Sequence, residues 1–438
     1  FDAGLILVRT TLLDVLTNGS EEAKKLASIA LGAIISRDAE SLRIALELIK
    51  GEPHNRYLLL SAINEAISRS TTDEQCVRIV SDALPVLVSI NDELLGGSSA
   101  GTGAAPPNYD SESIGESDKR GAVGAEVSSG AESIRSITAE CVGRMVRLLP
   151  DRVFRSLDSV LDGGRESSRI LRAALVRHAV CGGSAGRAAR KAVRSRIAEL
   201  IALVSDSSSV VRRHALVSLN IVMRLDITII SSHEDEVFRA IVRETNLDKS
   251  LIRTVNLGPF QYKEDDGLPL RKAAYECLIT LISLLRGHVD VDAVVGCITR
   301  GLADNPDVRS LATTCILGMA AQPTAFERLA SNVDALVSAL RSVLSQKPKV
   351  NAVRQEVERH DDAVLACLHS IKALANVSEV AAQPSFVAFV QDFVLSNDQF
   401  AKLYLTLEAD GSHGGILENA RRAAAGRAGA DETTMTDA

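Results

Sequence analysis

The sequence predicts an all-α fold, an array of repeated helix pairs with one inserted β-hairpin. Three observations lead to this class: the composition, a helical motif that recurs about every 38 residues, and one segment without helical periodicity. Of 438 residues, 46% are hydrophobic and 3% are aromatic. The apolar share excludes a wholly disordered chain. The scarcity of rings argues against carbohydrate clefts and base-stacking platforms for nucleic acids.

Charge and cysteine content narrow the class of partner. The net charge of −7 gives no general reason to expect DNA, RNA or an anionic membrane as a partner. The seven cysteines are widely separated and form no CxxC pair, which indicates neither a zinc site nor a disulfide framework. We therefore expect a reduced compartment, the cytoplasm and nucleus. No apolar run approaches the roughly 20 residues of a membrane-spanning helix.

Two stretches of low apolar content interrupt the predicted helices. Residues 96–132 are rich in Gly, Ser, Ala and acidic residues, and residues 409–438 have a similar composition. Such segments bury too little apolar surface to offset the entropy lost on ordering. We expect a disordered insertion at 96–132 and a flexible acidic tail at 409–438, with helical repeats at 1–95 and 133–408.

The predicted helices share the pattern basic–x–x–Ala/Thr–x–x–small–aliphatic, whose offsets fall on one side of a helix. It begins at Lys24, Arg135, Arg212, Arg271 and Arg309. The last two lie 38 residues apart, and most other intervals are two such steps once the 37-residue insertion is removed. This period is typical of HEAT repeats, and about nine of them would form a superhelical solenoid.

The position of this pattern that requires a small residue explains why several cysteines are where they are in the sequence. It is occupied by Cys141, Cys277 and Cys315, where other repeats have Ala30 and Ser218. A small residue is expected there because neighbouring helices approach closely. Equivalent positions in adjacent repeats lie roughly 8–10 Å apart, too far for thiols to share a metal. We therefore predict packing roles for these cysteines, and no metal or cofactor.

The interval from Arg212 to Arg271, 59 residues, contains about 20 more than one step, and they lie near 249–266. Gly258-Pro259 separates two β-prone runs there, so a turn at these residues would give a hairpin, although a wider four-residue turn stays open. The predicted cross-strand pairs are Leu257/Phe260, Val255/Tyr262 and Arg253/Glu264 on one face, and Asn256/Gln261 and Thr254/Lys263 on the other. Isolated hairpins are marginal in water. The apolar face should therefore pack on the helices or bind a partner.

The segment IRTVNLGPFQYKEDDGLPLRKAAYECLITLI (252–282) closely resembles the hairpin-bearing repeat of the cullin-associated and neddylation-dissociated protein family. Four further stretches are similar in the same order, namely EEAKKLASIALGAI, NRYLLLSAINEAI, IRSITAECVGRMVRLLPDRV and SSVVRRHALVSLN. The final MTDA also resembles the C-terminus of the family. The similarity covers nearly the whole chain except 96–132, and corresponds to the C-terminal third of the family members.

This resemblance implies a non-catalytic assembly and exchange factor of cullin–RING ubiquitin ligases. Its partner would be a cullin–RING core without its ubiquitin-like modifier, bound in competition with the adaptor that carries the substrate receptor. A separate N-terminal chain of the same family is a further candidate partner. The expected cullin-binding hairpin residues are Leu251, Val255, Leu257, Gly258, Pro259, Phe260 and Tyr262.

A second hypothesis is a HEAT-repeat transport or nucleic-acid-associated adaptor. It would use a basic face in the run from Arg187 to Arg196, formed by Arg187, Arg190, Lys191 and Arg194. No aromatic residue is interleaved with these cations, so we favour a solvated helix face or an acidic protein partner. We expect no nucleic acid and no membrane as a partner. No HExxH, Walker A, GxGxxG or GxSxG motif occurs, and we predict no catalytic residues and no enzyme.

Overall fold

The computed structural model of the chain describes residues 2–51, 54–96, 117–183, 186–257, 260–284, 289–348 and 353–409. The chain divides into two compact units, Phe1–Ser232 and His233–Ala438, here called unit 1 and unit 2. Almost all regular structure in the described residues is helical, and the exception is one two-stranded antiparallel sheet in unit 2.

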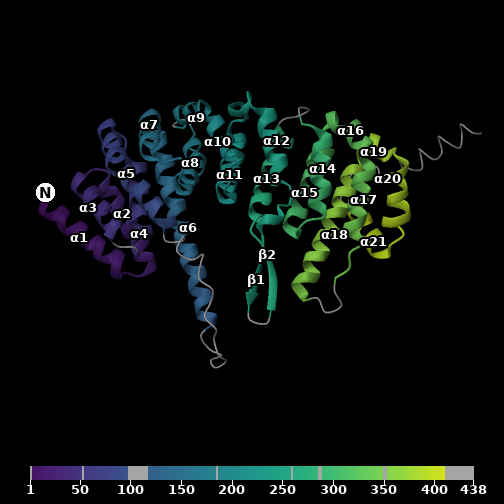
Figure 1. Cartoon of the computed structure of the whole chain (residues 1–438), viewed down its shortest axis with the longest axis horizontal. Coiled ribbons are helices and arrows are strands. Elements are labelled where there is room, and N and C mark those ends of the chain that lie inside the picture. The colour runs from purple at the N-terminus through teal and green to yellow at the C-terminus, as the bar shows by residue number, and fades with distance from the viewer. Residues whose placement is uncertain are drawn as a thin grey trace, which may run out of the picture. The chain divides into compact units, whose positions relative to one another are not determined.

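Unit 1 consists of two rows of helices (Figure 1). In the first row α2, α4, α6, α8 and α11 pack in succession, and in the second row α3, α5, α7 and α9 do so. The helices of the unit are α1 (Asp2–Asn18), α2 (Glu21–Ile35), α3 (Ala39–Gly51), α4 (Arg56–Arg69), α5 (Asp73–Gly96), α6 (Ser117–Leu148), α7 (Pro150–Val160), α8 (Glu166–Val180), α9 (Arg187–Arg194), α10 (Ile197–Leu203), α11 (Ser209–Leu225) and the short η2 (Ile227–Ile230).

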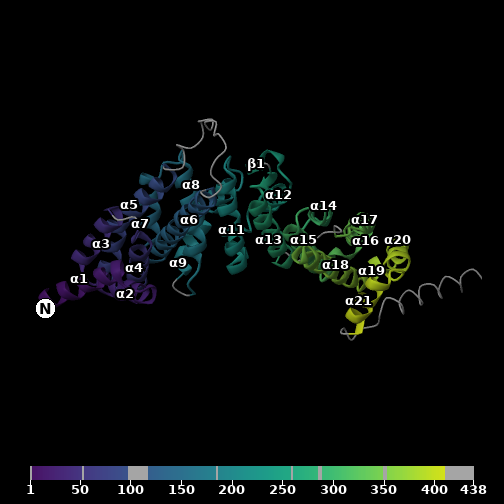
Figure 2. The same ribbon diagram turned by 90° about the horizontal axis from the view of Figure 1, so that it is seen from below.

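Unit 2 repeats this layering. Its first row is α13, α15, α18 and α21, and Figure 2 shows α14, α16 and α17 on one side of α15 and α18. The elements of the unit are α12 (Glu234–Glu244), η3 (Lys249–Leu251), β1 (Ile252–Leu257), β2 (Phe260–Asp265), α13 (Leu268–Leu284), α14 (Val291–Leu302), α15 (Pro306–Ala320), η4 (Pro323–Ala325), α16 (Phe326–Ser331), α17 (Val333–Leu344), α18 (Arg354–Ala375), α19 (Ser378–Ala381), α20 (Pro384–Phe389), η5 (Val390–Val394) and α21 (Asp398–Ala409). The predicted all-α HEAT-repeat class with one inserted hairpin is confirmed.

The small position of the repeat lies where first-row helices meet. Cys141 and Ser218 have no exposed surface, and each donates a hydrogen bond to a backbone carbonyl of the preceding first-row helix. The Ser218 Oγ lies 2.6 Å from the Ala173 oxygen. Cys277 and Cys315 are equally buried. Packing therefore accounts for the cysteines of this register, and within the described ranges no cluster of His, Cys, Asp or Glu is arranged to hold a metal ion.

The basic residue that opens the repeat also has a structural role. Arg212 Nη1 donates to the Asp206 carbonyl at 2.9 Å, and Arg309 Nε donates to the Leu302 carbonyl at 2.9 Å. Carbonyls at and beyond a helix C-terminus lack helical partners, and a cation there also interacts favourably with the helix dipole. In these two repeats the arginine therefore ties a first-row helix to the end of the helix before it.

Parts of the predicted insertion and tail cannot be compared with the structure. Residues 97–116 and 410–438 lie outside the described residues, whereas α6 begins at Ser117, inside the range predicted as an insertion. The boundaries of both segments stay predictions. None of the described helices combines the length and apolarity required to cross a membrane.

Candidate protein-binding surfaces

The hairpin of unit 2 has the predicted register. Strands β1 and β2 are antiparallel, and all five predicted cross-strand pairs are present. The pairing extends to Leu257 and Phe260, which leaves only Gly258 and Pro259 for the connection. These two residues lie outside the described part of the chain, as do the side chains of Leu257 and Phe260. The hairpin therefore follows the sequence pattern as far as the structure describes it.

A buried arginine fixes the base of the hairpin. Arg271, on the first turn of α13, has a side chain that is 2% exposed and pairs with two carboxylates. Its Nη2 lies 2.7 Å from Asp265 Oδ2 at the end of β2, and its Nε lies 2.8 Å from Asp304 Oδ2, just after α14. Hydrogen bonding from Arg271 holds the pKa of Asp265 below its usual value. The guanidinium thus joins the strands to both helix rows.

A second ion-pair group at the hairpin base is exposed. Arg253 pairs with Glu264 at 3.0 Å, as the sequence predicts, and also with Asp266 at 2.9 Å. The Arg253 side chain is 61% exposed, so solvent screens both contacts. We therefore assign most of the anchoring to Arg271.

The strands extend away from the helices at the start of α13 (Figure 1). Tyr262 keeps 45% of its surface exposed. Val255, its cross-strand partner, and Leu251, just before β1, are part-buried. An anchored hairpin with an exposed tyrosine is suited to contact another protein, because little further ordering is needed on binding.

The predicted basic face is only partly available to a ligand. Arg190 donates to the carbonyls of Val180 at 3.1 Å and Gly183 at 3.0 Å, at and beyond the end of α8. Arg194 pairs with Asp226 at 3.4 Å and also bonds Thr228. Arg187 and Lys191 are exposed on α9. Two of the four predicted cations are thus engaged within unit 1, which weakens the hypothesis of a transport or nucleic-acid-associated adaptor that uses this face.

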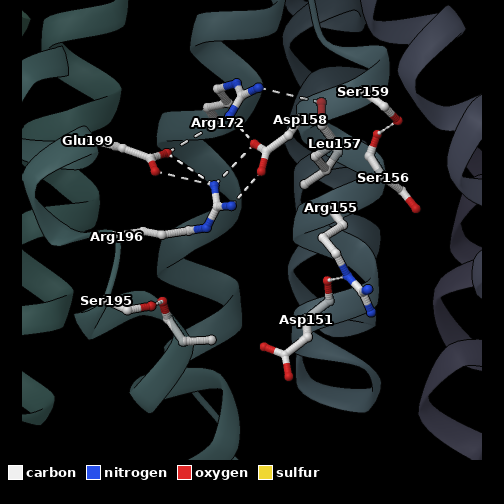
Figure 3. Close-up of polar contacts among 11 residues, drawn as sticks. Asp151, Arg155, Ser156, Leu157, Asp158, Ser159, Arg172, Ser195, Arg196 and Glu199 are labelled. Atoms are coloured by element: carbon white, nitrogen blue, oxygen red, sulfur yellow. Dashed lines mark hydrogen bonds and ion pairs between the residues drawn. The ribbon is translucent and has the colours of Figure 1, made fainter.

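Arg196, which ends the basic run, belongs to a balanced charge network (Figure 3). Its guanidinium pairs with Asp158 of α7 and lies 3.3 Å from Glu199 of α10, while Arg172 of α8 reaches Asp158 at 3.0 Å. The hydrogen bond from Arg196 lowers the pKa of Asp158. Arg196 also lies 4.9 Å from the centre of the Phe154 ring, a cation–π contact. Two arginines and two carboxylates compensate one another here, so this network ties α7, α8 and α10 together.

An apolar cavity of about 110 Å³ lies next to this network. Its walls come from α7, α8, α9 and α10. The apolar lining residues are Phe154, Leu157, Leu175, Val176, Val193, Leu200 and Leu203. Arg172, Arg196 and Glu199 of the charge network complete its lining.

Comparisons with known proteins identify relatives along nearly the whole chain. A family model described as TATA-binding protein interacting (TIP20) matches residues 229–394. Over 413 residues the chain is 26% identical to Cullin-associated NEDD8-dissociated protein 2 of Rattus norvegicus, covering 94% of this chain and 29% of that protein. Over 248 residues it is 29% identical to Cullin-associated NEDD8-dissociated protein 1, C-terminal part, of Emericella nidulans, covering 56% of this chain and 23% of that protein.

The chain thus spans 29% of the length of the rat relative. Among solved structures, Kap121p bound to RanGTP has a TM-score of 0.55 at 12% identity, covering 90% of this chain and 36% of that chain. Importin Beta in an ammonium sulfate condition has a TM-score of 0.52 at 12% identity, covering 90% and 51%. At this identity the likeness concerns the HEAT-repeat fold alone.

Proposed function

From its confirmed resemblance to the cullin-associated and neddylation-dissociated protein family, we propose that this chain is a non-catalytic assembly and exchange factor of cullin–RING ubiquitin ligases. Its partner is a cullin–RING core without its ubiquitin-like modifier. The relatives are named as cullin-associated proteins, and this supports the partner class. We place such a factor in the cytoplasm and nucleus.

The hairpin is the proposed competing element. It occupies the N-terminal region of the cullin at the position that the substrate-receptor adaptor needs. Two ligands that exclude each other weaken each other's binding by the same factor at equilibrium. Binding of the chain therefore releases one adaptor, and a new adaptor releases the chain.

The observation that carries this proposal is the buried anchor at the hairpin base. A two-stranded sheet alone is marginally stable in water. Arg271 holds Asp265 and Asp304 together, and this keeps the strands oriented before binding. Preorganisation of this kind raises affinity because less conformational freedom is lost in the complex. An exposed Tyr262 on such an element fits a contact residue, since tyrosine is common at binding hot spots.

A displacement assay tests the proposal. Labelled adaptor is bound to an unmodified cullin core, and its release by the chain is followed by fluorescence anisotropy. Combined serine substitution of Val255, Leu257, Phe260 and Tyr262 should reduce displacement by at least roughly thirtyfold, because a central aromatic hot spot contributes about 2 kcal/mol. Matched alanine substitutions at Thr254 and Lys263, on the opposite face of the strands, should have little effect. Equal displacement by both variants would contradict the hairpin mechanism.

The first helices also present a surface for the separate N-terminal chain. Leu26 is 69% exposed and Ile29 is 47% exposed on α2. Ala30 is exposed too, although it occupies the register at which Cys141 and Ser218 contact the preceding first-row helix. A helix pair packed on this side of α2 would continue the array. We propose that the separate chain of the same family binds there.

A further inference from the structure

The last part of unit 1 is much more basic than the chain as a whole. Residues 133–232 contain 17 Lys and Arg against eight Asp and Glu, a net charge of +9, whereas the chain carries −7. These cations are not confined to the basic face predicted on α9. A second group lies on the first-row helices α6, α8 and α11.

This group, here called the first-row arginine cluster, has more cations than carboxylates. It consists of Arg135, Arg144, Arg147, Arg177 and Arg213, with Glu132 and Glu140 as the acidic members. Arg135 pairs with Glu132 at 2.8 Å, and Arg144 pairs with Glu140 at 2.6 Å. Within the described residues the remaining three arginines form no ion pair with Glu132 or Glu140, although both carboxylates act on the charge of Arg177.

Arg177 lies at the centre of the cluster and contacts two imidazoles. Its Nε donates to His178 Nε2 at 3.0 Å, and its Nη1 lies 3.5 Å from His214 Nδ1. Burial, and then the charge of Arg177, lower the pKa of His178 to about 4. Burial also lowers the pKa of His214 to about 4, against the opposing effect of Glu132. At neutral pH the direct contacts of Arg177 in the described residues are thus two neutral rings, while Glu132 and Glu140 act on its charge without forming an ion pair with it.

Two polar atoms of the cluster also lack hydrogen-bond partners. His214 Nε2 and Arg135 Nε are buried and make no hydrogen bond within the described residues. The nearest acid to His214 is Glu132, whose Oε1 is 3.8 Å from Nε2. Buried polar atoms of folded proteins are normally satisfied, so unsatisfied ones call for an explanation. These two atoms show that the polar groups of this region are not fully matched by acceptors within the described residues.

We propose that the first-row arginine cluster binds an acidic segment of a partner protein, whose carboxylates pair with Arg177 and Arg213. Arg213 is exposed on α11. Burial is the largest cause of the lowered pKa of Arg177, and the charge of Arg213 adds to it while that of Glu132 opposes it. Guanidinium groups that form no ion pair of their own attract carboxylates, which they can bind in a bidentate manner. For the identity of the partner, the inference rests on the proposed cullin complex.

Carboxylates fit this surface better than a nucleic acid does. Helices α6, α8 and α11 contain no Phe, Tyr or Trp, so bases would find no stacking platform on them. Arg177 is part-buried, and the Arg144 side chain is 29% exposed. A single carboxylate on a flexible side chain can reach a part-buried guanidinium more readily than a continuous phosphate backbone can.

The test uses isothermal titration calorimetry to measure how tightly the unmodified cullin core binds variants in which glutamine replaces two cations. Arg177→Gln with Arg213→Gln should weaken binding by roughly tenfold to a hundredfold, and should reduce its dependence on salt. The matched control is Arg187→Gln with Lys191→Gln, which removes the same charge from exposed positions on α9. Its affinity should stay within about twofold of the unsubstituted chain. Arg213→Gln alone serves as a variant at an exposed position whose fold is not at risk.

Further outcomes separate this inference from the proposed function. If the cullin core binds both variants equally well, the inference is wrong, while the proposed function still stands on the hairpin variant. If the unsubstituted chain does not bind the core, the proposed function fails, and titration with poly-L-glutamate decides the inference. Loss of poly-L-glutamate binding in the Arg177/Arg213 variant supports it, and unchanged binding overturns it. A 20-base-pair DNA duplex that binds more tightly than poly-L-glutamate, through the same two arginines, would overturn it in favour of nucleic acid.

Discussion

Arg271 in unit 2 is buried and Arg177 in unit 1 is part-buried, but only Arg271 is paired with carboxylates. Arg271 lies between the carboxylates of Asp265 and Asp304, both within 2.8 Å of its nitrogens. Arg177 lies between the rings of His178 and His214. A fully paired guanidinium holds its neighbours together, whereas an unpaired one keeps an electrostatic field that another molecule can use. The comparison therefore distinguishes Arg271, which anchors the hairpin, from Arg177, which is available to a partner.

The largest expected effect comes from breaking the anchor. Arg271→Gln removes the buried cation and leaves two part-buried carboxylates without their shared partner, which should lower the free energy of unfolding by about 3–4 kcal/mol. Chemical denaturation monitored by circular dichroism measures this. The matched control is Arg253→Gln, because Arg253 also contacts two carboxylates but is 61% exposed. Its cost should be below about 1 kcal/mol. Similar losses in the two variants would show that burial of Arg271 does not matter.

The anchor also illustrates what the sequence could and could not predict. The hairpin register follows from local alternation on either side of Gly258-Pro259, and the charge pair of Arg253 and Glu264 follows from the register. The repeat period likewise predicts the helical array. Both features depend on residues close in sequence or on regular spacing. The hairpin register and the helical array can therefore be predicted from the sequence alone.

Contacts between repeats were not accessible in this way. Asp304 lies 33 residues after Arg271, and His214 lies 37 residues after Arg177. The sequence shows the basic position of the repeat as part of a helical stripe, but the hydrogen bonds of this residue to helix ends are visible only in the structure. The run at Arg187–Arg196 looked like one basic face, yet its arginines turn towards separate partners in the fold. The partners of these arginines depend on the direction in which each side chain leaves a short helix, and the residue spacing alone does not give that direction.

The second prediction tests the helix contact that positions Arg177. Gly143 on α6 faces α8, and a Cβ there would lie 2.6 Å from the Leu175 oxygen and 2.5 Å from the His178 Cβ. Gly143→Ala should therefore destabilise the protein by about 2–3 kcal/mol, because backbone atoms of α8 must move. Gly130→Ala is the control on the same helix, since a Cβ added there would have nothing within 4 Å. It should be neutral or stabilise by up to about 1 kcal/mol. Thermal unfolding of both variants distinguishes a tight contact from a loose one.

The smallest expected effect is a pH dependence that belongs to the Arg177 site and not to the Arg271 anchor. The pKa of His214 is about 4 in the folded chain, against about 6.5 when unfolded. Burial is the largest cause, and Arg177, Arg213 and Arg135 add to it while Glu132 opposes it. Below pH 6.5 the unfolded chain binds the proton more readily, so stability is lost as the pH falls towards 4.

Between pH 7.5 and pH 5 this loss should amount to about 1–2 kcal/mol for His214. The measurement is the free energy of unfolding at several pH values, with His214→Gln as the variant. Replacement by a neutral amide should remove about half of the slope that the two histidines produce in this interval, because His178, whose pKa is also about 4, keeps its share. Arg253→Gln should leave the slope unchanged. Arg271 and Asp265, whose pKa Arg271 holds below its usual value, stay charged throughout the interval and contribute no slope. A profile that is unchanged by His214→Gln would mean that the ring has the same pKa in the folded and unfolded chain, and burial beside Arg177 would then not disfavour its protonated form.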